Sequence, residues 1–248
     1  MCTLIALHRV IPDTPLLVAS NRDEYYARPA EPPTRVEAKS PEGPAFVAPH
    51  DLEAGGTWMG LNKVGVFVGL TNRRTEHREA GRRSRGLLVA DALGRPSARA
   101  VAKEMRTGLA GRYNPFHLFY ADGRDAFLTV LREDGVETRE LPPGIHVVGN
   151  RDAADPASRK LTRLQAQVGA LDLDAPLAVT LESLRTLLSG HPDPTEPLEN
   201  PCVHTPAYGT RSSSLIAVGS RPWGYWHAEG APCQSKYENV SGLLDDLR

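Results

Sequence analysis

The sequence predicts an α+β fold in which antiparallel sheets and helices are segregated. Near the amino end, two pairs of apolar runs are each joined by a short polar turn, which is the pattern of β-hairpins. Further along, groups of strands alternate with groups of helices, with neither strict βαβ alternation nor an internal repeat. Hairpins favour antiparallel sheets with helices packed on one side. No interior linker is visible, so we expect a single domain over residues 1–248.

The first expected hairpin lies at the amino end. Its strands are residues 3–10 and 15–20, which are apolar and are joined by a turn containing two prolines. The second strand runs directly into the polar sequence Asn21-Arg22-Asp23-Glu24.

A long loop and a second hairpin are expected next. Residues 27–57 are rich in Pro, Glu and Gly and lack a hydrophobic period, so we predict a loop. A loop of this length in a compact domain is typically functional. Residues 55–61 and 64–70 then form a hairpin that ends in Asn72, and its glycines allow close approach of a ligand or another backbone.

The rest of the chain is expected to hold helices and strands in groups. Helical spacing of apolar residues occurs in four segments, 87–93, 97–107, 161–168 and 177–188. Short apolar runs bounded by turn residues predict strands at 116–121, 126–132, 136–141, 145–149 and 212–218, with a hairpin partner around 223–226. A Pro-rich loop is expected over 190–207 and a short helix near the carboxyl end.

Composition excludes several functional classes. The 29 Lys and Arg balance the 30 Asp and Glu, so no nucleic acid or anionic membrane is expected as a partner. No apolar run approaches the roughly 20 residues of a membrane span, and a secretory signal is not expected, because His8 and Arg9 break the first apolar run. Three cysteines are too few for a disulfide framework, which favours a reducing compartment and predicts a cytoplasmic protein.

Cys2 directly follows the initiator methionine. If Met1 is removed, the thiol and a free α-amine share one carbon, so one residue supplies a nucleophile and a base. A free thiol has a pKa of about 8.5 and an α-amine of about 7.7–8.0, so part of the amine is able to accept the thiol proton at neutral pH. The alternative is that Cys2 is a small apolar residue at a strand end, as most cysteines are. Position alone leaves both interpretations open.

Polar residues gather at the ends of several expected strands. Asn21-Arg22-Asp23, Asn72 and Asn150 each follow an apolar run, and Arg211 precedes one. Asn and Asp commonly cap turns, and for Asn72 alone that interpretation is favoured. An adjacent Arg and Asp at a strand exit make a poor turn but a good charge clamp.

Around Cys2, these residue types suit acyl transfer. Arg22 would stabilise the thiolate, and Asp23 would orient the α-ammonium group. The side-chain amides of Asn72 or Asn150 are suitable donors to the oxyanion that forms when the thiolate attacks an acyl carbon. Arg211 would assist the same charge or order the site.

Five motifs together resemble the NRDE-motif family, the homologues of transport and Golgi organisation protein 2. They are Met1-Cys2-Thr3, Asn21-Arg22-Asp23-Glu24, Gly56-Thr57-Trp58-Met59-Gly60-Leu61-Asn62, Gly69-Leu70-Thr71-Asn72 and Tyr208-Gly209-Thr210-Arg211-Ser212-Ser213. More distantly, the pattern is similar to the choloylglycine hydrolase and penicillin V acylase group of N-terminal nucleophile hydrolases. That resemblance implies a four-layer αββα sandwich of two antiparallel sheets flanked by helices, and cleavage of linear amides by an N-terminal cysteine.

The resemblance also assigns roles. Cys2 matches the nucleophile of that group, and the residues that match its other site positions are Arg22, Asp23, Asn72, Asn150 and Arg211. Asn21 and Trp58 are expected to contact substrate. Trp58 lies in a glycine-rich hairpin that would suit the border of a pocket, and packing in the core is the alternative interpretation for it. Two features depart from the pattern: the Arg and Asp of that group are separated by two residues but are adjacent here, and the sequence around Asn150 matches only loosely.

Two functions are therefore expected, with a third kept open. The first is an N-terminal cysteine amidohydrolase acting on carbon–nitrogen bonds other than peptide bonds in a small acyl substrate. The alternative is a non-catalytic carrier of haem, acyl-coenzyme A or lipid, because eukaryotic members of the resembled family are associated with those molecules. A cysteine-dependent redox protein is the third, although no Cys-x-x-Cys motif is present.

Two further features have both a functional and an ordinary interpretation. The arginine-rich segment 73–85 would suit the phosphates of coenzyme A, but a solvated loop is the favoured interpretation. Cys202, His204, Cys233 and His227 are metal-ligand types, but their spacing is not that of the usual zinc patterns, so no metal or other cofactor is expected.

Overall fold

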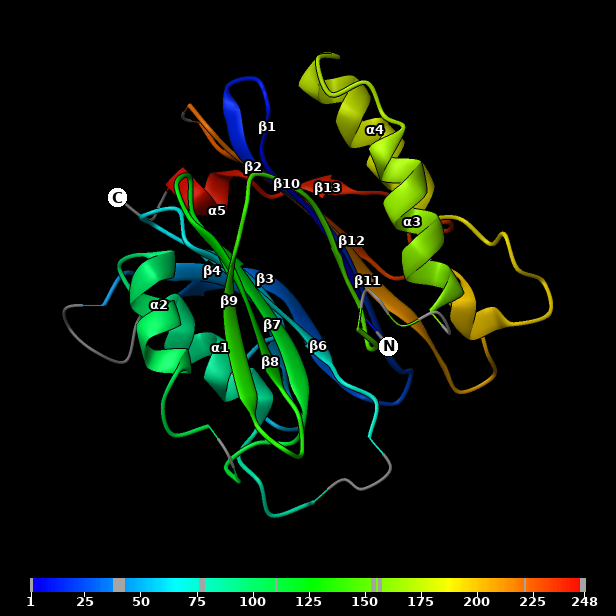
Figure 1. Cartoon of the computed structure of the whole chain (residues 1–248). Coiled ribbons are helices and arrows are strands. Elements are labelled where there is room, and N and C mark those ends of the chain that lie inside the picture. Colours follow the sequence, from blue (N-terminus) through cyan, green and yellow to red (C-terminus); the bar gives the residue numbers. More distant parts are fainter. Residues whose placement is uncertain are drawn as a thin grey trace. The chain divides into compact units, whose positions relative to one another are not determined.

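The computed structural model describes residues 2–37, 43–75, 79–109, 111–152, 155, 158–220 and 222–245. The chain divides into two compact units, Met1–Arg28 with Pro143–Ser241 and Pro29–Pro142 with Gly242–Arg248. Each unit has its own antiparallel sheet and its own helices, as Figure 1 shows element by element. The prediction of a single domain stays a prediction, and the units are described in turn.

The sheet of the first unit is centred on the amino-terminal hairpin. Its described strands lie in the order β10-β1-β2-β11-β12-β13, and all neighbours pair antiparallel. They are β1 (Thr3–Ile11), β2 (Thr14–Tyr25), β10 (Gly144–Val148), β11 (Tyr208–Val218), β12 (Gly224–Glu229) and β13 (Glu238–Asn239). The predicted first hairpin is confirmed, and strands from much later in the chain complete the sheet on both sides of it.

Two helices cover one face of this sheet. α3 (Arg159–Gly169) contacts β10, and α4 (Leu177–Leu188) contacts β2 (Figure 1). Their buried leucines meet odd-numbered strand residues such as Ile5 and Leu17 in one apolar cluster. Because side chains alternate along a strand, even-numbered residues of β1 and β2 lie on the opposite face. Each fully buried leucine contributes about 1.5–3 kcal/mol to this packing.

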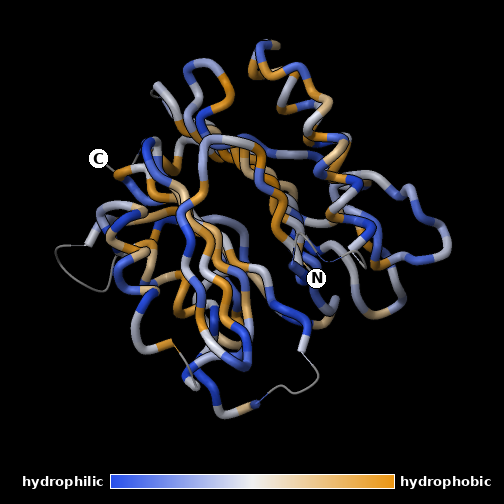
Figure 2. Tube along the Cα trace, viewed as in Figure 1, coloured by the Kyte–Doolittle hydropathy of each residue, from blue (hydrophilic) through white to orange (hydrophobic). Residues whose placement is uncertain are grey.

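The second unit is a meander, in which strand order follows chain order. Its sheet runs from β3 to β9, through β3 (Ala30–Val36), β4 (Phe46–Asp51), β5 (Met59–Asn62), β6 (Phe67–Asn72), β7 (Phe116–Ala121), β8 (Ala126–Leu131) and β9 (Val136–Leu141). Its helices are α1 (Arg85–Leu93), α2 (Ala98–Met105) and the short α5 (Gly242–Asp245). Figure 2 shows apolar residues concentrated along the central strands and the inner faces of α1 and α2, which form one buried cluster.

Serine caps start two of these helices where the sequence predicts helical spacing. The Ser84 hydroxyl accepts a hydrogen bond from the Gly86 N–H at α1, and the Ser97 hydroxyl accepts one from the Ala100 N–H at α2. The helical predictions for 87–93, 97–107, 161–168 and 177–188 are thus confirmed. The described helices are too short or too polar for any of them to be a membrane span.

The predicted loop over 27–57 is wrong in part, because β3 and β4 lie within it. Pro32 and Pro33 lack the N–H that a central strand needs, but β3 is an edge strand whose register shifts between Glu31 and Thr34. Proline is tolerated at such an edge bulge, so composition alone concealed a strand. Residues 38–42, also in the predicted loop, lie outside the described residues.

Candidate active site

Strand register places Cys2 between two of its predicted partners. β1 pairs Thr3 with Asn21 of β2 and Leu4 with Val148 of β10. Continuing the β1–β2 ladder by one residue sets Cys2 opposite Arg22, and continuing the β1–β10 ladder by two residues sets Cys2 opposite Asn150. The central position of β1 therefore brings together three segments that are far apart in the sequence.

Close packing at Gly149 supports this placement of Asn150. A Cβ atom built on Gly149 would lie 2.7 Å from a methyl carbon of Leu161 on α3, so a larger residue there would require the Leu161 side chain to move. Gly149 thus faces the helices, and if the alternation of β10 continues past Val148, Asn150 turns to the other face, where Arg22 also lies. Arg22 and Asn150 are both buried.

The environment of the Cys2 sulfur favours the neutral thiol. Cys2 is half-buried, and its sulfur accepts a hydrogen bond from the backbone N–H of Asp23. Burial raises the pKa of the thiol, and the Asp23 carboxylate raises it further. The Asp23 N–H and the Arg22 guanidinium act in the opposite direction. A base is therefore needed to generate the thiolate at neutral pH.

Asp23 lies on the helix side of the sheet, where its carboxylate is enclosed. The Thr210 hydroxyl donates to its Oδ1 at 2.7 Å, and the Lys160 Nζ lies 3.8 Å from its Oδ2. Burial raises the pKa of the Asp23 carboxyl, whereas Lys160 and the Thr210 hydrogen bond lower it. The carboxylate therefore belongs to a buried ion pair.

Lys160 is a site residue that the sequence pattern did not predict. Its side chain is 6% exposed although it lies in the first turn of α3, where a positive charge opposes the helix dipole. The Glu199 carboxylate accepts the Lys160 backbone N–H at 2.9 Å and caps this helix end. One signal was available: Lys160 precedes Leu164 and Val168 by four and eight residues, so it lies on the apolar stripe of the helix.

Asn21 anchors two backbone segments to the end of β2. Its Nδ2 donates to the carbonyls of Leu188 and Pro201, each at 2.9 Å, and the residue is fully buried. Its amide donors are thus used by the backbone, and the predicted contact of Asn21 with substrate stays a prediction.

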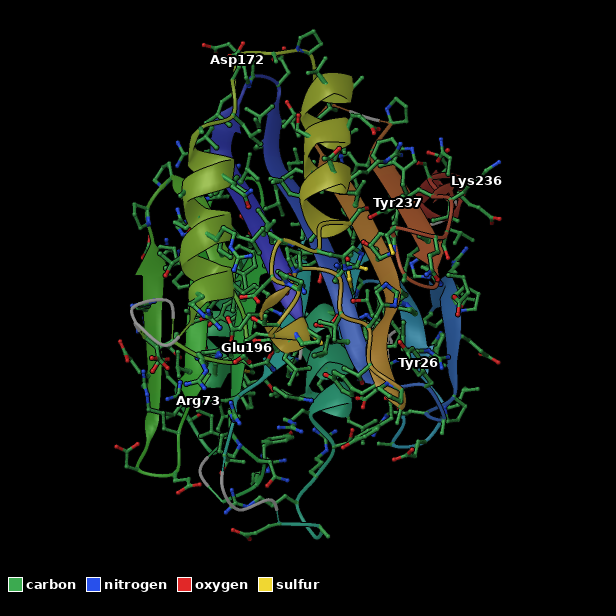
Figure 3. All side chains as sticks on the ribbon, turned by 90° about the vertical axis from the view of Figure 1, so that its right-hand side faces the viewer. Tyr26, Arg73, Asp172, Glu196, Lys236 and Tyr237 are labelled. Atoms are coloured by element: carbon green, nitrogen blue, oxygen red, sulfur yellow. The ribbon has the colours of Figure 1, made fainter. Side chains whose placement is uncertain are left out.

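Arg211 lies at a bulge in β11, where the register with β2 shifts between Thr210 and Ser212. Its guanidinium donates to the carbonyl of Tyr26, just beyond β2. Figure 3 labels Tyr26 close to the end of β11, at the rim of the sheet. Arg211 therefore ties the exit of β2 to β11, and its contact with an oxyanion stays a prediction.

Asn72 and Trp58 belong to the second unit. Asn72 ends β6 opposite Phe116 of β7, and the Trp58 carbonyl accepts the Leu70 N–H at 2.8 Å. Their proposed roles at Cys2 stay predictions.

The arginine-rich segment makes local contacts within its own unit. Arg82 and Arg85 donate to the carbonyls of Tyr113 and Pro115, and Arg83 donates to the Tyr113 hydroxyl and pairs with Asp91. These guanidinium groups thus brace the chain before β7. Residues 76–78 of the segment lie outside the described residues.

From the sequence, His227 was considered as a metal ligand together with Cys202, His204 and Cys233. In the structure both ring nitrogens of His227 have other partners, the Ser214 hydroxyl at 2.9 Å and the Glu229 carboxylate at 3.4 Å. The fourth member of the cluster is instead His191, which the sequence pattern did not predict.

Comparison with known proteins identifies related sequences. The family model described as Transport and Golgi organisation 2 matches residues 1–222. The "Transport and Golgi organization protein 2 homolog" of Homo sapiens is 27% identical over 230 residues, and the mouse "Transport and Golgi organization 2 homolog" is 28% identical over 235 residues. Each match covers 82% of this chain and 82% of the relative.

Solved structures share the fold at low identity. A conjugated bile acid hydrolase from Clostridium perfringens aligns with a TM-score of 0.59 at 10% identity, covering 98% of this chain and 93% of that one. The Caenorhabditis elegans N-acylethanolamine-hydrolyzing acid amidase ortholog aligns with a TM-score of 0.52 at 13% identity, covering 90% and 94%. The fold is therefore the α+β fold of N-terminal nucleophile hydrolases, as the resemblance implied.

Proposed function

The chain belongs to the Transport and Golgi organisation 2 family, and from this premise we propose that it is an N-terminal cysteine amidohydrolase. Its substrate would be a small molecule in which an acyl group is joined to an amine by a linear amide. One observation carries the proposal: the register sets Cys2 between Arg22 and Asn150, with the Asp23 N–H bonded to its sulfur. In this proposal Cys2, Arg22 and Asn150 would supply a nucleophile, a fixed cation and an amide donor at one strand end.

The first half of the reaction forms a thioester. Removal of Met1 frees the α-amine of Cys2, which takes the thiol proton directly or through water. The sulfur attacks the acyl carbon, and the carbon–nitrogen bond of the resulting tetrahedral intermediate breaks. The leaving nitrogen receives its proton from the α-ammonium group, so an amine departs and the acyl group remains on Cys2.

The second half releases the acid. Water attacks the thioester carbon while the α-amine accepts one of its protons, and the carbon–sulfur bond breaks. The sulfur regains a proton, and a carboxylic acid leaves. The overall reaction consumes one water for each amide cleaved.

The surrounding groups have distinct roles in this scheme. Arg22 and the Asp23 N–H stabilise the thiolate, because both lower the pKa of the thiol. The side-chain amide of Asn150 is the proposed donor to the oxyanion. Asp23, held by Thr210 and Lys160, is a positioning residue for the ammonium group, and Arg211 positions the end of β2.

The names of the structural relatives support the substrate class. One is a hydrolase of conjugated bile acids and the other hydrolyses N-acylethanolamines, so both names describe the cleavage of acyl conjugates. The free thiols of Cys2, Cys202 and Cys233 suit a reducing compartment, and we propose a cytoplasmic location.

The test combines intact mass with turnover. Protein expressed without an amino-terminal tag is expected to lack Met1, and a β-lactone acylating probe should label Cys2 in a peptide map. A panel of acyl-aminocoumarins of increasing chain length should then reveal an active substrate. Cys2→Ala is expected to abolish turnover, whereas Arg99→Ala, a surface variant, should retain it. Two results would contradict the proposal: a catalytically active protein that retains Met1, or turnover by the Cys2→Ala variant.

A carrier of haem, acyl-coenzyme A or lipid is the second candidate. The raised pKa of the Cys2 thiol and the engagement of Asp23 by Lys160 favour it, because both restrain the nucleophile. Titration with haem and with palmitoyl-coenzyme A would test it in wild type and Cys2→Ala. If the wild type and Cys2→Ala bind one of these ligands tightly and with equal affinity, the carrier function is supported. If neither protein binds either ligand, the carrier function is excluded.

A further inference from the structure

We propose that His191, Cys202, His204 and Cys233 bind one zinc ion that stabilises the region beside the candidate active site. The structure brings one ligand atom from each of these four side chains within 4.8 Å of the others. Two thiols and two imidazoles are a donor set that zinc uses in closed structural sites. All four residues belong to the first unit.

The interatomic distances match tetrahedral zinc. With zinc–sulfur bonds of about 2.3 Å and zinc–nitrogen bonds of about 2.0–2.1 Å, a tetrahedron sets its sulfurs about 3.8 Å apart and sulfur about 3.5 Å from nitrogen. Here the Cys202 and Cys233 sulfurs are 3.6 Å apart. The His204 Nε2 lies 3.6 Å from the Cys202 sulfur and 3.1 Å from that of Cys233.

His191 supplies the fourth ligand. Its ring centroid lies 5.1 Å from that of His204, with the ring planes tilted by 41°. Parallel stacking would separate the two rings face to face, whereas this tilt suits two imidazoles directed toward a common ion. With four protein ligands the coordination shell is full, so the site is structural, with no open position for catalysis.

The ligands come from two segments that their own backbones hold in place. The first segment carries His191, Cys202 and His204. Within it the Cys202 N–H donates to the Gly190 carbonyl at 3.3 Å, which holds the chain on the two sides of the loop together. Cys233 of the second segment lies in a turn, which is closed by a hydrogen bond of 2.8 Å from the Ser235 N–H to the Ala231 carbonyl. Lys236 and Tyr237, which follow this turn, lie beside α4 in Figure 3, and the Arg185 guanidinium stacks 4.9 Å from the Tyr237 ring centroid.

The cluster connects to Asp23 through two hydrogen bonds. Val203, between the ligands Cys202 and His204, donates its N–H to the Thr210 hydroxyl at 2.8 Å. That hydroxyl in turn donates to the Asp23 carboxylate at 2.7 Å. A metal fixed on both sides of Val203 would therefore hold Thr210, and through it the carboxylate, in one position.

A disulfide is the competing interpretation of the two cysteines. Their sulfurs are 3.6 Å apart, well beyond the bonded distance of about 2.05 Å, and both thiols are free. A disulfide would also leave the approach of both histidines unexplained. Zinc accounts for all four residues together.

The test measures metal content and ligand identity without reference to activity. Wild-type protein purified under reducing conditions is expected to contain one zinc per chain by elemental mass spectrometry. Replacement by Co²⁺ should give the visible absorption of a tetrahedral site together with a sulfur-to-cobalt charge-transfer band. A zinc chelator should lower the Tm of the wild type.

Variants identify the ligands. Loss of a group that only supports a ligand costs about 10–100-fold in metal affinity, so Cys233→Ser and His191→Ala are each expected to weaken zinc binding by at least about 100-fold. Both positions are exposed, which limits damage to the fold. Cys2→Ala and His50→Ala are the matched controls and should bind zinc as the wild type does. Zinc binding weaker than micromolar in the wild type, unchanged binding by Cys233→Ser, or a Cys202–Cys233 disulfide in reduced protein would each overturn the proposal.

Discussion

The two units bury polar side chains in different ways. In the second unit, Asp122 accepts three backbone N–H groups, from Ala98, Arg124 and Asp125, at 2.8–2.9 Å. In the first unit, Asp23 is equally inaccessible, but its oxygens face the Thr210 hydroxyl and the Lys160 ammonium group. Asp122 shapes a turn and caps the start of a helix, whereas Asp23 holds another ionisable side chain inside the protein.

The same contrast separates two buried asparagines. Asn62 uses its whole amide on backbone groups: it donates to the carbonyls of Leu93 and Arg95 at the end of α1 and accepts from the N–H groups of Val64 and Val66. Asn21 donates its amide hydrogens to the carbonyls of Leu188 and Pro201, which lie more than 160 positions later in the sequence. The buried polar side chains Asp122 and Asn62 of the second unit thus bind backbone groups, whereas in the first unit Asp23 also faces a charged side chain.

The largest expected effect comes from breaking the buried ion pair. Lys160→Met should lower the free energy of unfolding by about 3–5 kcal/mol, because it leaves the Asp23 carboxylate buried without its cation. Urea denaturation measures the loss. The double variant Asp23→Leu with Lys160→Met should recover much of it, since no unpaired charge remains. A single variant as stable as the wild type would show that the pair is not buried as described.

Removing Asn62 should have a smaller effect. Asn62→Ala leaves two carbonyls and two N–H groups of the second unit without their side-chain partners, at an expected cost of about 1–3 kcal/mol for the groups that water cannot reach. Thermal and urea unfolding would measure it. Zinc content should stay unchanged, because no ligand lies in that unit. A loss of zinc in Asn62→Ala would show that the second unit also supports the proposed zinc site in the first unit.

The titration of Cys2 tests the electrostatics of the site. Negative charge disfavours the thiolate, so Asp23→Asn should lower the pKa of the thiol, and Arg22→Gln should raise it because a stabilising cation is lost. The pH dependence of iodoacetamide alkylation, followed on the Cys2 peptide by mass spectrometry, gives the midpoint. Below that midpoint alkylation is slow and above it fast, so the two variants should shift the profile in opposite directions. Shifts of the same sign would disprove the assigned geometry.

The smallest effect is expected at the surface of the second unit. Arg99 pairs with Asp125 at 2.6 Å, but its side chain is 61% exposed. Arg99→Ala should therefore leave the free energy of unfolding close to that of the wild type, because water screens this ion pair. Comparison of Arg99→Ala with Lys160→Met separates the effect of burying an ion pair from the effect of the ion pair itself on the free energy of unfolding. A loss as large as that of Lys160→Met would show that exposure is a poor guide here.

The sequence predicted those features that depend on local pattern. Hairpin turns, helix periodicity and the polar end of β2 are readable because each is encoded within a few residues. β3 was missed because its prolines are acceptable only at an edge, and edge position is a property of the whole sheet. Lys160 and the place of His191 in the metal-ligand cluster were missed for a similar reason. Asp23 lies 137 positions before Lys160, and Cys233 lies on a different loop from His191.

The central position of β1 and β2 has a consequence for the order in which the chain assembles during synthesis. The second unit is a meander of neighbouring strands, so almost all of its sheet can form soon after residue 142 leaves the ribosome. The amino-terminal hairpin must wait for β10 and then β11, and both of its edges stay open until they arrive. Throughout that interval the first residues of the chain are accessible to a processing peptidase. The topology therefore allows Met1 to be trimmed before the strands that flank Cys2 are in place.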